Sequence, residues 1–131
     1  MLSIRTSVVG LALLLMGSAE AQAQEIYAGH YPQVTGEAIY KGVCQGCHMP
    51  NAMGAVGAGA YPALAHNSHL QAGAYPALVV LNGRKAMPSF GDSFSDEQVS
   101  AVVNYIRMNF GNHYPEPITA AEVSALRTPT K

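Results

Sequence analysis

The sequence has no tryptophan, three phenylalanines and only two cysteines in 131 residues. Charged residues make up 11% of the chain, and the seven basic ones form no stripe, so the composition does not indicate nucleic-acid binding. The length leaves room for one small domain, whose few aromatic side chains limit the apolar surface that it can bury. Domains of this kind often depend on a disulfide, a metal or a cofactor for stability.

The sequence also has no apolar run long enough to cross a membrane at its N-terminus. The run from Val8 to Met16 is about half of the roughly 20 residues that a bilayer requires. Arg5 precedes this run and Ala21-Gln22-Ala23 follows it, which is the pattern of a cleaved signal peptide. We therefore expect residues 1–23 to be a signal peptide, cleaved near Ala23. The mature protein would be periplasmic or secreted, with no membrane span.

Both cysteines lie in one motif, Cys44-Gln45-Gly46-Cys47-His48. This C-x-x-C-H pattern is typical of covalent haem c attachment. Two thiols at the end of a helix can each form a thioether with a haem vinyl group, and the adjacent histidine is then placed to bind the iron, a metal that imidazole suits. We expect Cys44 and Cys47 to hold one haem c and His48 to be an axial iron ligand.

Two other interpretations of the cysteine pair have less support. A redox-active dithiol usually has a strand and a crossover helix around it, and no such alternation is predicted near residue 44. A zinc site would need two more ligands, for which His66 and His69 have suggestive spacing, but a second cysteine pair is missing. Export also favours haem, because an exported C-x-x-C thiol pair tends to oxidise, whereas haem thioethers cannot be reduced away.

The second axial ligand separates an electron carrier from a haem enzyme or gas sensor, because methionine opposite histidine raises the potential of the iron. Met87 is the best candidate, since it lies in a Gly- and Pro-punctuated loop between two helical patterns. The other methionines are in the signal peptide, close to His48 or inside a predicted helix, namely Met1, Met16, Met49, Met53 and Met108. A second histidine, from among His66, His69 and His113, remains the alternative.

Apolar spacing and capping residues predict an all-α domain. Two of the helices are expected to begin with capping boxes, at Ser95 with Gln98 and at Thr119 with Glu122. The expected helices cover about Gly36–Cys47, Pro76–Asn82, Ser95–Asn109 and Thr119–Leu126, and residues 49–60 are expected to form a loop with little charge. We divide the chain into a signal peptide (1–23), an N-terminal extension (24–34), a haem domain (35–111) and a C-terminal tail with a short helix (112–131).

Taken together, these residues resemble the class I c-type cytochromes over about residues 35 to 110. The resemblance implies a small all-α fold, three to five helices around one covalently bound haem. It also implies that Gly36 and Tyr40 pack against Tyr105 of the last main helix, where small residues let two helices approach closely. In that family a proline carbonyl accepts the ring N–H of the proximal histidine, and Pro62 matches this proline.

More narrowly, the segments around Met87, Phe94 and Thr119 resemble the cytochrome subunits and partner cytochromes of periplasmic dehydrogenases. This resemblance implies a one-electron carrier, not itself an enzyme, that accepts electrons from a periplasmic dehydrogenase and passes them to an oxidase or another cytochrome of a respiratory chain. A haem enzyme or gas sensor with a displaceable sixth ligand is the alternative. Docking is expected to involve the uncharged segment Met49 to Ala60, with Arg84 and Lys85 as its nearest positive charges.

Overall fold

The computed structural model describes residues 30–57 and 59–127. The expected signal peptide and residues 24–29 of the extension therefore lie outside the described residues. In chain order the elements are α1 (Gly36–Ile39), η2 (Tyr40–Cys44), α2 (Gln45–His48), β1 (Ala55–Val56), β2 (Ala60–Tyr61), η3 (Ser68–Leu70), α3 (Ala74–Asn82), α4 (Asp96–Met108) and α5 (Ala120–Leu126). Within the described ranges, no helix is both long and apolar enough to cross a bilayer.

The first helical segment is continuous from Gly36 to His48 but changes its winding in the middle. Thr35 caps it, with its hydroxyl accepting from the backbone N–H of Ala38 at 3.2 Å. Its central part, Tyr40–Cys44, is a π-helix, which the apolar spacing did not predict. Single π turns inside α-helices are rare and are frequently found at functional sites, and this one leads directly into the second cysteine and His48.

The first segment crosses α4 with very little space between the two backbones. A Cβ atom on Gly36 would lie 2.1 Å from the carbonyl oxygen of Ala101 and 2.6 Å from Cβ of Tyr105, so only glycine fits. Next to this crossing, the rings of Tyr40 and Tyr105 lie 5.9 Å apart, and those of Tyr40 and Phe110 4.8 Å apart. The expected packing of Gly36 and Tyr40 on Tyr105 is therefore found in the structure.

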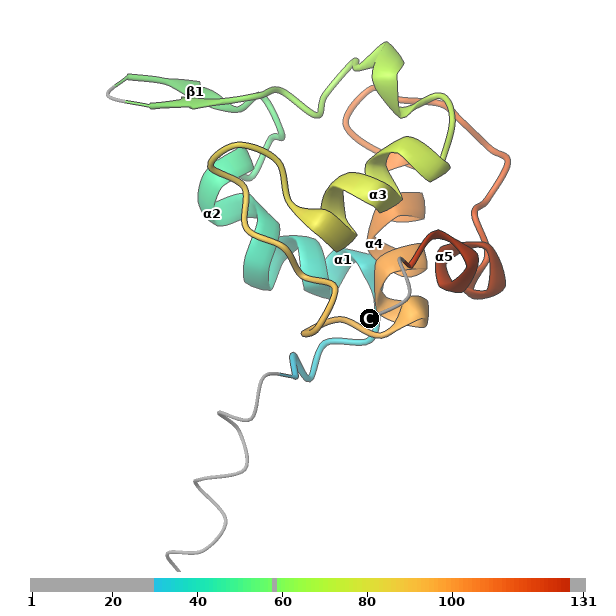
Figure 1. The fold of residues 1–131 in the computed structure, drawn as a ribbon. Coiled ribbons are helices and arrows are strands. Elements are labelled where there is room, and N and C mark those ends of the chain that lie inside the picture. Colours follow the sequence, from blue (N-terminus) through green and yellow to red (C-terminus); the bar gives the residue numbers. More distant parts are fainter. Residues whose placement is uncertain (1–29, 58, 128–131) are drawn as a thin grey trace, which may run out of the picture.

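The core is built around α4. The apolar stripe of this helix is buried, with Val99, Val102 and Val103 fully covered. Both predicted capping boxes are present, at Ser95 for α4 and at Thr119 for α5. In Figure 1, α5 lies beside α4 at the right of the molecule and α3 crosses in front of it. The helix predicted from Pro76 begins two residues earlier, at Ala74.

Part of the segment expected to be an irregular loop is an antiparallel hairpin. Its strands pair Ala55 with Tyr61 and Val56 with Ala60. The sequence contains no signal for it, because Gly- and Ala-rich strands of two residues have no alternating pattern. Figure 1 shows the hairpin extending away from the helices. Apart from it, the all-α expectation is confirmed.

Candidate functional site

His48 is the last residue of α2, and its side chain is buried, with 8% exposure. Its ring nitrogen Nδ1 lies 3.0 Å from the carbonyl oxygen of Pro62. A carbonyl oxygen can only accept a hydrogen bond, so Nδ1 carries the proton. The other ring nitrogen, Nε2, then has the free lone pair, which is the form of imidazole that binds metals. Pro62, which the family resemblance predicted as the acceptor, therefore lies within hydrogen-bonding distance of the His48 ring.

The hairpin holds His48 from both of its ends. Pro62, directly after β2, accepts from the ring, and Gly54, directly before β1, donates its backbone N–H to the carbonyl of His48 at 3.1 Å. Gly54 has a positive φ of 65°, and a Cβ atom there would lie 2.1 Å from the carbonyl oxygen of Tyr61. Only glycine combines that conformation with so close an approach. The sequence alone did not indicate that Gly54 contacts His48, because the hairpin itself was not predicted.

The two cysteines are close in sequence but differ in environment. Cys44 is half-buried in the π-helix and packs against the core, whereas Cys47 is exposed on α2. Burial, together with the neighbouring Cys47, raises the pKa of the Cys44 thiol to about 11. Reactive C-x-x-C thiols have a lowered pKa instead. The environment of Cys44 therefore does not favour the dithiol alternative.

Met87 lies in the loop between α3 and α4 and is half-buried against the core. Its backbone exchanges two hydrogen bonds with Arg84, each 3.0 Å long, which close a tight turn. At the start of this turn, a Cβ atom on Gly83 would lie 2.6 Å from the carbonyl oxygen of Met87. Farther along, the backbone N–H groups of Phe90 and Gly91 donate to the end of α3. The predicted loop is therefore an ordered turn that fixes the backbone of Met87.

These residues fit a haem group. Imidazole and thioether are both ligands that iron accepts, and the two free cysteines provide the thiols for covalent attachment. Several apolar side chains rest on the core but are only partly covered, as the walls of a site for a flat apolar group would be. They include Val43, Leu64, Met87 and Phe90.

The rival ligands are not brought together. His66, His69 and His113 are exposed. His66 packs against Gly111, where a Cβ atom would lie 1.9 Å from the imidazole ring. Over residues 30–57 and 59–127, no group of three or more His, Cys, Asp or Glu side chains is placed to hold a metal ion. The structure does not support the zinc alternative.

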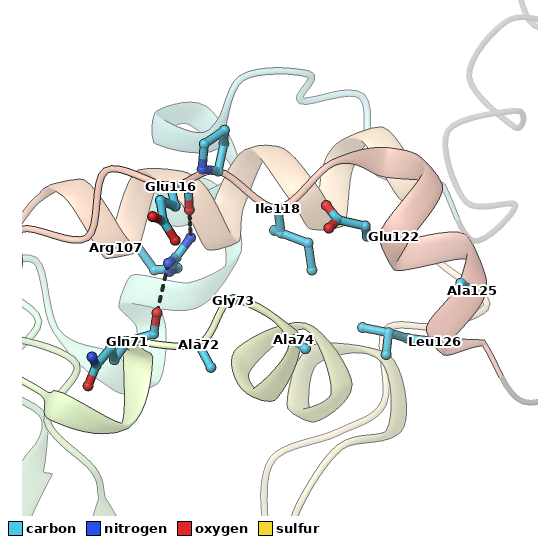
Figure 2. A pocket seen from close by; sticks show the side chains of 11 residues that line it. Gln71, Ala72, Gly73, Ala74, Arg107, Glu116, Ile118, Glu122, Ala125 and Leu126 are labelled. Carbon is cyan, nitrogen blue, oxygen red and sulfur yellow. Dashed lines mark hydrogen bonds between the residues drawn. The ribbon is translucent and has the colours of Figure 1, made fainter.

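A separate groove lies between α3, α4 and the C-terminal tail (Figure 2). Arg107 closes one end of it, with 3% exposure. Its guanidinium donates to the backbone carbonyls of Leu70 and Gln71, each at 2.9 Å, and to that of Glu116. None of the residues predicted to bind haem lines this groove, so it is distinct from the candidate site. Arg107 instead ties the tail to the loop before α3.

Comparisons with known proteins point to one family. The family model described as cytochrome c oxidase, cbb3-type, subunit III, matches residues 32–106. One of the subunits of nicotinate dehydrogenase from Pseudomonas putida is 33% identical over 76% of this chain, and the gluconate 2-dehydrogenase cytochrome c subunit of Pantoea cypripedii is 31% identical over 80%. The chain spans 10% and 26% of the lengths of these two relatives.

A solved structure, cytochrome c6C from Synechococcus, aligns with 58% of this chain and 94% of its own, at 26% identity and a TM-score of 0.49. The family model is the finding that decides the assignment, because it covers more than half of the chain and includes the whole C-x-x-C-H motif. The chain therefore belongs to the cytochrome c family, as a class I domain of the kind that binds haem c covalently.

Proposed function

We propose that this protein carries one electron at a time on a single haem c. Cys44 and Cys47 form the thioether bonds, and His48 and Met87 are the axial ligands. The observation that carries the proposal is the hydrogen bond from His48 Nδ1 to the carbonyl of Pro62, because it selects the tautomer whose Nε2 can bind iron. When bound, the haem supplies an iron that changes between the ferrous and ferric states.

The protein's own residues set how that iron behaves. An iron held by the His48 imidazole and the Met87 thioether would have a raised potential and no coordination position open for substrate. The Pro62 carbonyl increases the basicity of His48 and fixes its ring orientation. The turn at Arg84 and Met87 holds the methionine backbone in one conformation. These features suit a carrier, which must exchange electrons with little rearrangement, better than a gas sensor with a displaceable ligand.

The proposed location is the periplasm, after signal-peptide cleavage near Ala23. The proposed donor is a periplasmic dehydrogenase, to which this protein would be a subunit or a soluble partner, and an oxidase or another cytochrome would be the acceptor in a respiratory chain. Support comes from the signal-peptide pattern and from relatives whose names place them in nicotinate and gluconate dehydrogenases.

The proposed docking surface is uncharged. No Asp, Glu, Lys or Arg occurs from Gly42 to Gly83, a stretch that includes the motif and the hairpin. On the hairpin and its approach, Val56 is 92% exposed, and Met53 and Tyr61 are also exposed. Both ends of the hairpin contact His48, so a partner bound at those ends would lie close to the proposed ligand. Such docking should depend weakly on salt.

Absorption spectroscopy of the mature protein tests the ligand assignment. Ferric haem with a methionine ligand gives a weak band in the far red, and Met87→Ala should abolish it. The matched control is Met53→Ala, which removes an exposed methionine five residues after His48 and should leave the band intact. Persistence of the band in Met87→Ala, or its absence from the wild type, would overturn the His48/Met87 assignment. Ready binding of carbon monoxide by the reduced wild type would favour the sensor alternative.

A further inference from the structure

The loop that carries Met87 is attached to the last described residue of the chain. Nε of Arg127 forms an ion pair with Asp96 at 2.5 Å, at the start of α4. The same guanidinium donates from Nη2 to the carbonyl of Phe94 at 2.8 Å and from Nη1 to that of Gly91. Both carbonyls belong to the segment between Met87 and α4. One side chain at the end of α5 therefore contacts two carbonyls of this loop and the first residue of α4.

The N-terminal side of the described chain contacts the same segment. The ring of Tyr31 lies 5.0 Å from that of Phe94 in an edge-on arrangement, and the rings of Phe90 and Phe94 stack at 5.0 Å. The side chain of Gln98 donates to the backbone carbonyls of Tyr31 and Gln33, each at 2.7 Å. The N-terminal segment thus contributes an aromatic contact and two hydrogen bonds, whereas Arg127 supplies a charged contact from the tail.

The contacts of Arg127 with Asp96, Gly91 and Phe94 stabilise the loop mainly in combination. The side chains of Arg127 and Asp96 keep 32% and 24% exposure, so the ion pair alone contributes little. Hydrogen bonds from a guanidinium to carbonyls are charge-assisted and stronger than neutral ones, and the planar fork of arginine reaches several acceptors at once. Lysine has the same charge but lacks this fork.

We infer that Arg127 is a positioning residue, which holds the loop at Gly91 and Phe94 so that Met87 stays in place for the iron. This inference depends on the proposed ligand role of Met87. Its consequence is that the C-terminal helix α5, which contains none of the residues proposed to touch haem, supports the axial ligand. Loss of the Arg127 contacts should make the loop that carries Met87 more mobile, while the helical segment that ends at His48 stays unchanged.

The test compares Arg127→Ala and Arg127→Lys with a control, Lys41→Ala, which removes an exposed ion pair to Glu37 on the first helical segment. Hydrogen exchange of the holoprotein reports on the loop without depending on ligand assignment. In Arg127→Ala, the amides of Phe90, Gly91 and Phe94 should exchange on the order of tenfold faster, with amides of residues 36–48 unchanged. Arg127→Lys should lie between the alanine variant and the wild type, and Lys41→Ala should match the wild type.

The far-red methionine band supplies the second measurement. It should disappear at a lower temperature in Arg127→Ala than in the wild type, and below the temperature of global unfolding. Unchanged exchange rates and an unchanged band would overturn the inference while leaving the Met87 assignment intact. Faster exchange in a protein whose wild type has no such band would instead overturn the ligand role through which Arg127 is proposed to act. Equal acceleration of residues 36–48 would show a general loss of stability and also overturn it.

Discussion

The carbonyl oxygen of Pro62 lies 3.0 Å from Nδ1 of His48, although the two residues are separated by a complete hairpin. That hairpin begins beside Gly54, whose backbone N–H donates to His48 at 3.1 Å. The histidine that is proposed to bind iron is therefore held at its ring and at its carbonyl by the two ends of one small element. The position of the His48 side chain therefore depends on how closely the two ends of the hairpin approach each other.

Substitution of Gly54 should disturb this arrangement. A Cβ atom would meet the carbonyl oxygen of Tyr61 at 2.1 Å, and the positive φ disfavours any side chain. We expect Gly54→Ala to lower the free energy of unfolding by roughly 2 to 4 kcal/mol and to alter the Soret spectrum through His48. Urea unfolding and absorption spectra of the purified protein measure both effects. A variant with wild-type stability would show that the two ends of the hairpin can separate without cost.

The helix crossing at Gly36 provides a second prediction. Gly36→Ala places a methyl group 2.1 Å from the carbonyl oxygen of Ala101, and we expect this overpacking to lower the free energy of unfolding by roughly 1 to 3 kcal/mol. The matched control is Gly46→Ala on the same helical segment, where no protein atom outside the helix backbone and the two adjacent residues lies within 4 Å of the added Cβ. That change should stabilise by about 0.5 to 1 kcal/mol, because alanine favours helix. Denaturant titration should thus give shifts of opposite sign, and equal signs would contradict the crossing geometry.

The uncharged surface leads to a prediction about electron exchange. Electron self-exchange between oxidised and reduced copies, measured by nuclear magnetic resonance line broadening, brings two docking surfaces together. Its rate should change by less than about threefold between about 0.01 and 0.15 M ionic strength. Val56→Glu should slow it by at least about threefold, because two new like charges would meet. Val34→Glu, at another well-exposed valine just before α1, should have no effect. Equal slowing by both variants would argue against docking through the hairpin.

Tyr40 should make stability depend on pH in the alkaline range. Burial, the largest cause, raises its pKa from 10.0 to about 12. Below pH 10 the phenol is protonated in both states, so its contribution is fully present there. As the pH rises from 10 to 12 the unfolded state loses the proton first, and stability falls by roughly 2 kcal/mol.

Comparison with Tyr40→Phe isolates this effect. The variant lacks the titrating group, and it also lacks the 2.7 Å hydrogen bond from the tyrosine hydroxyl to the carbonyl of Met49. It should therefore be less stable by about 1 kcal/mol at pH 9 but show a flatter profile above pH 10. Unfolding free energies at several pH values give the comparison. Parallel profiles for the two proteins would assign the alkaline loss of stability to other groups.

The sequence predicted those parts of the site that depend on short-range patterns. The C-x-x-C-H motif, the capping boxes at Ser95 and Thr119 and the loop around Met87 are all local, and the helices formed close to their expected ranges. The cytochrome c family and its all-α fold are confirmed. The signal peptide and the division of the chain into segments stay predictions, as do the haem ligands.

What the sequence could not predict depends on contacts between distant residues. The hairpin lacks alternating hydrophobicity, so nothing local indicated strands at Ala55 or Ala60. The π-helix at Tyr40–Cys44 differs from an α-helix by one residue in its hydrogen bonding, a difference that apolar spacing does not resolve. Arg127 joins residues more than 30 positions away, and no short motif marks such a contact.

The two arginines that fasten the C-terminal tail differ in how far their contacts are exposed to solvent. Arg107 is buried and donates only to backbone carbonyls, so its attachment should hardly depend on salt. Arg127 keeps 32% exposure and contacts the carboxylate of Asp96 as well as two carbonyls, so part of its attachment should weaken as ionic strength rises. The tail therefore has one buried attachment at Arg107 and one partly exposed attachment at Arg127, with α5 between them.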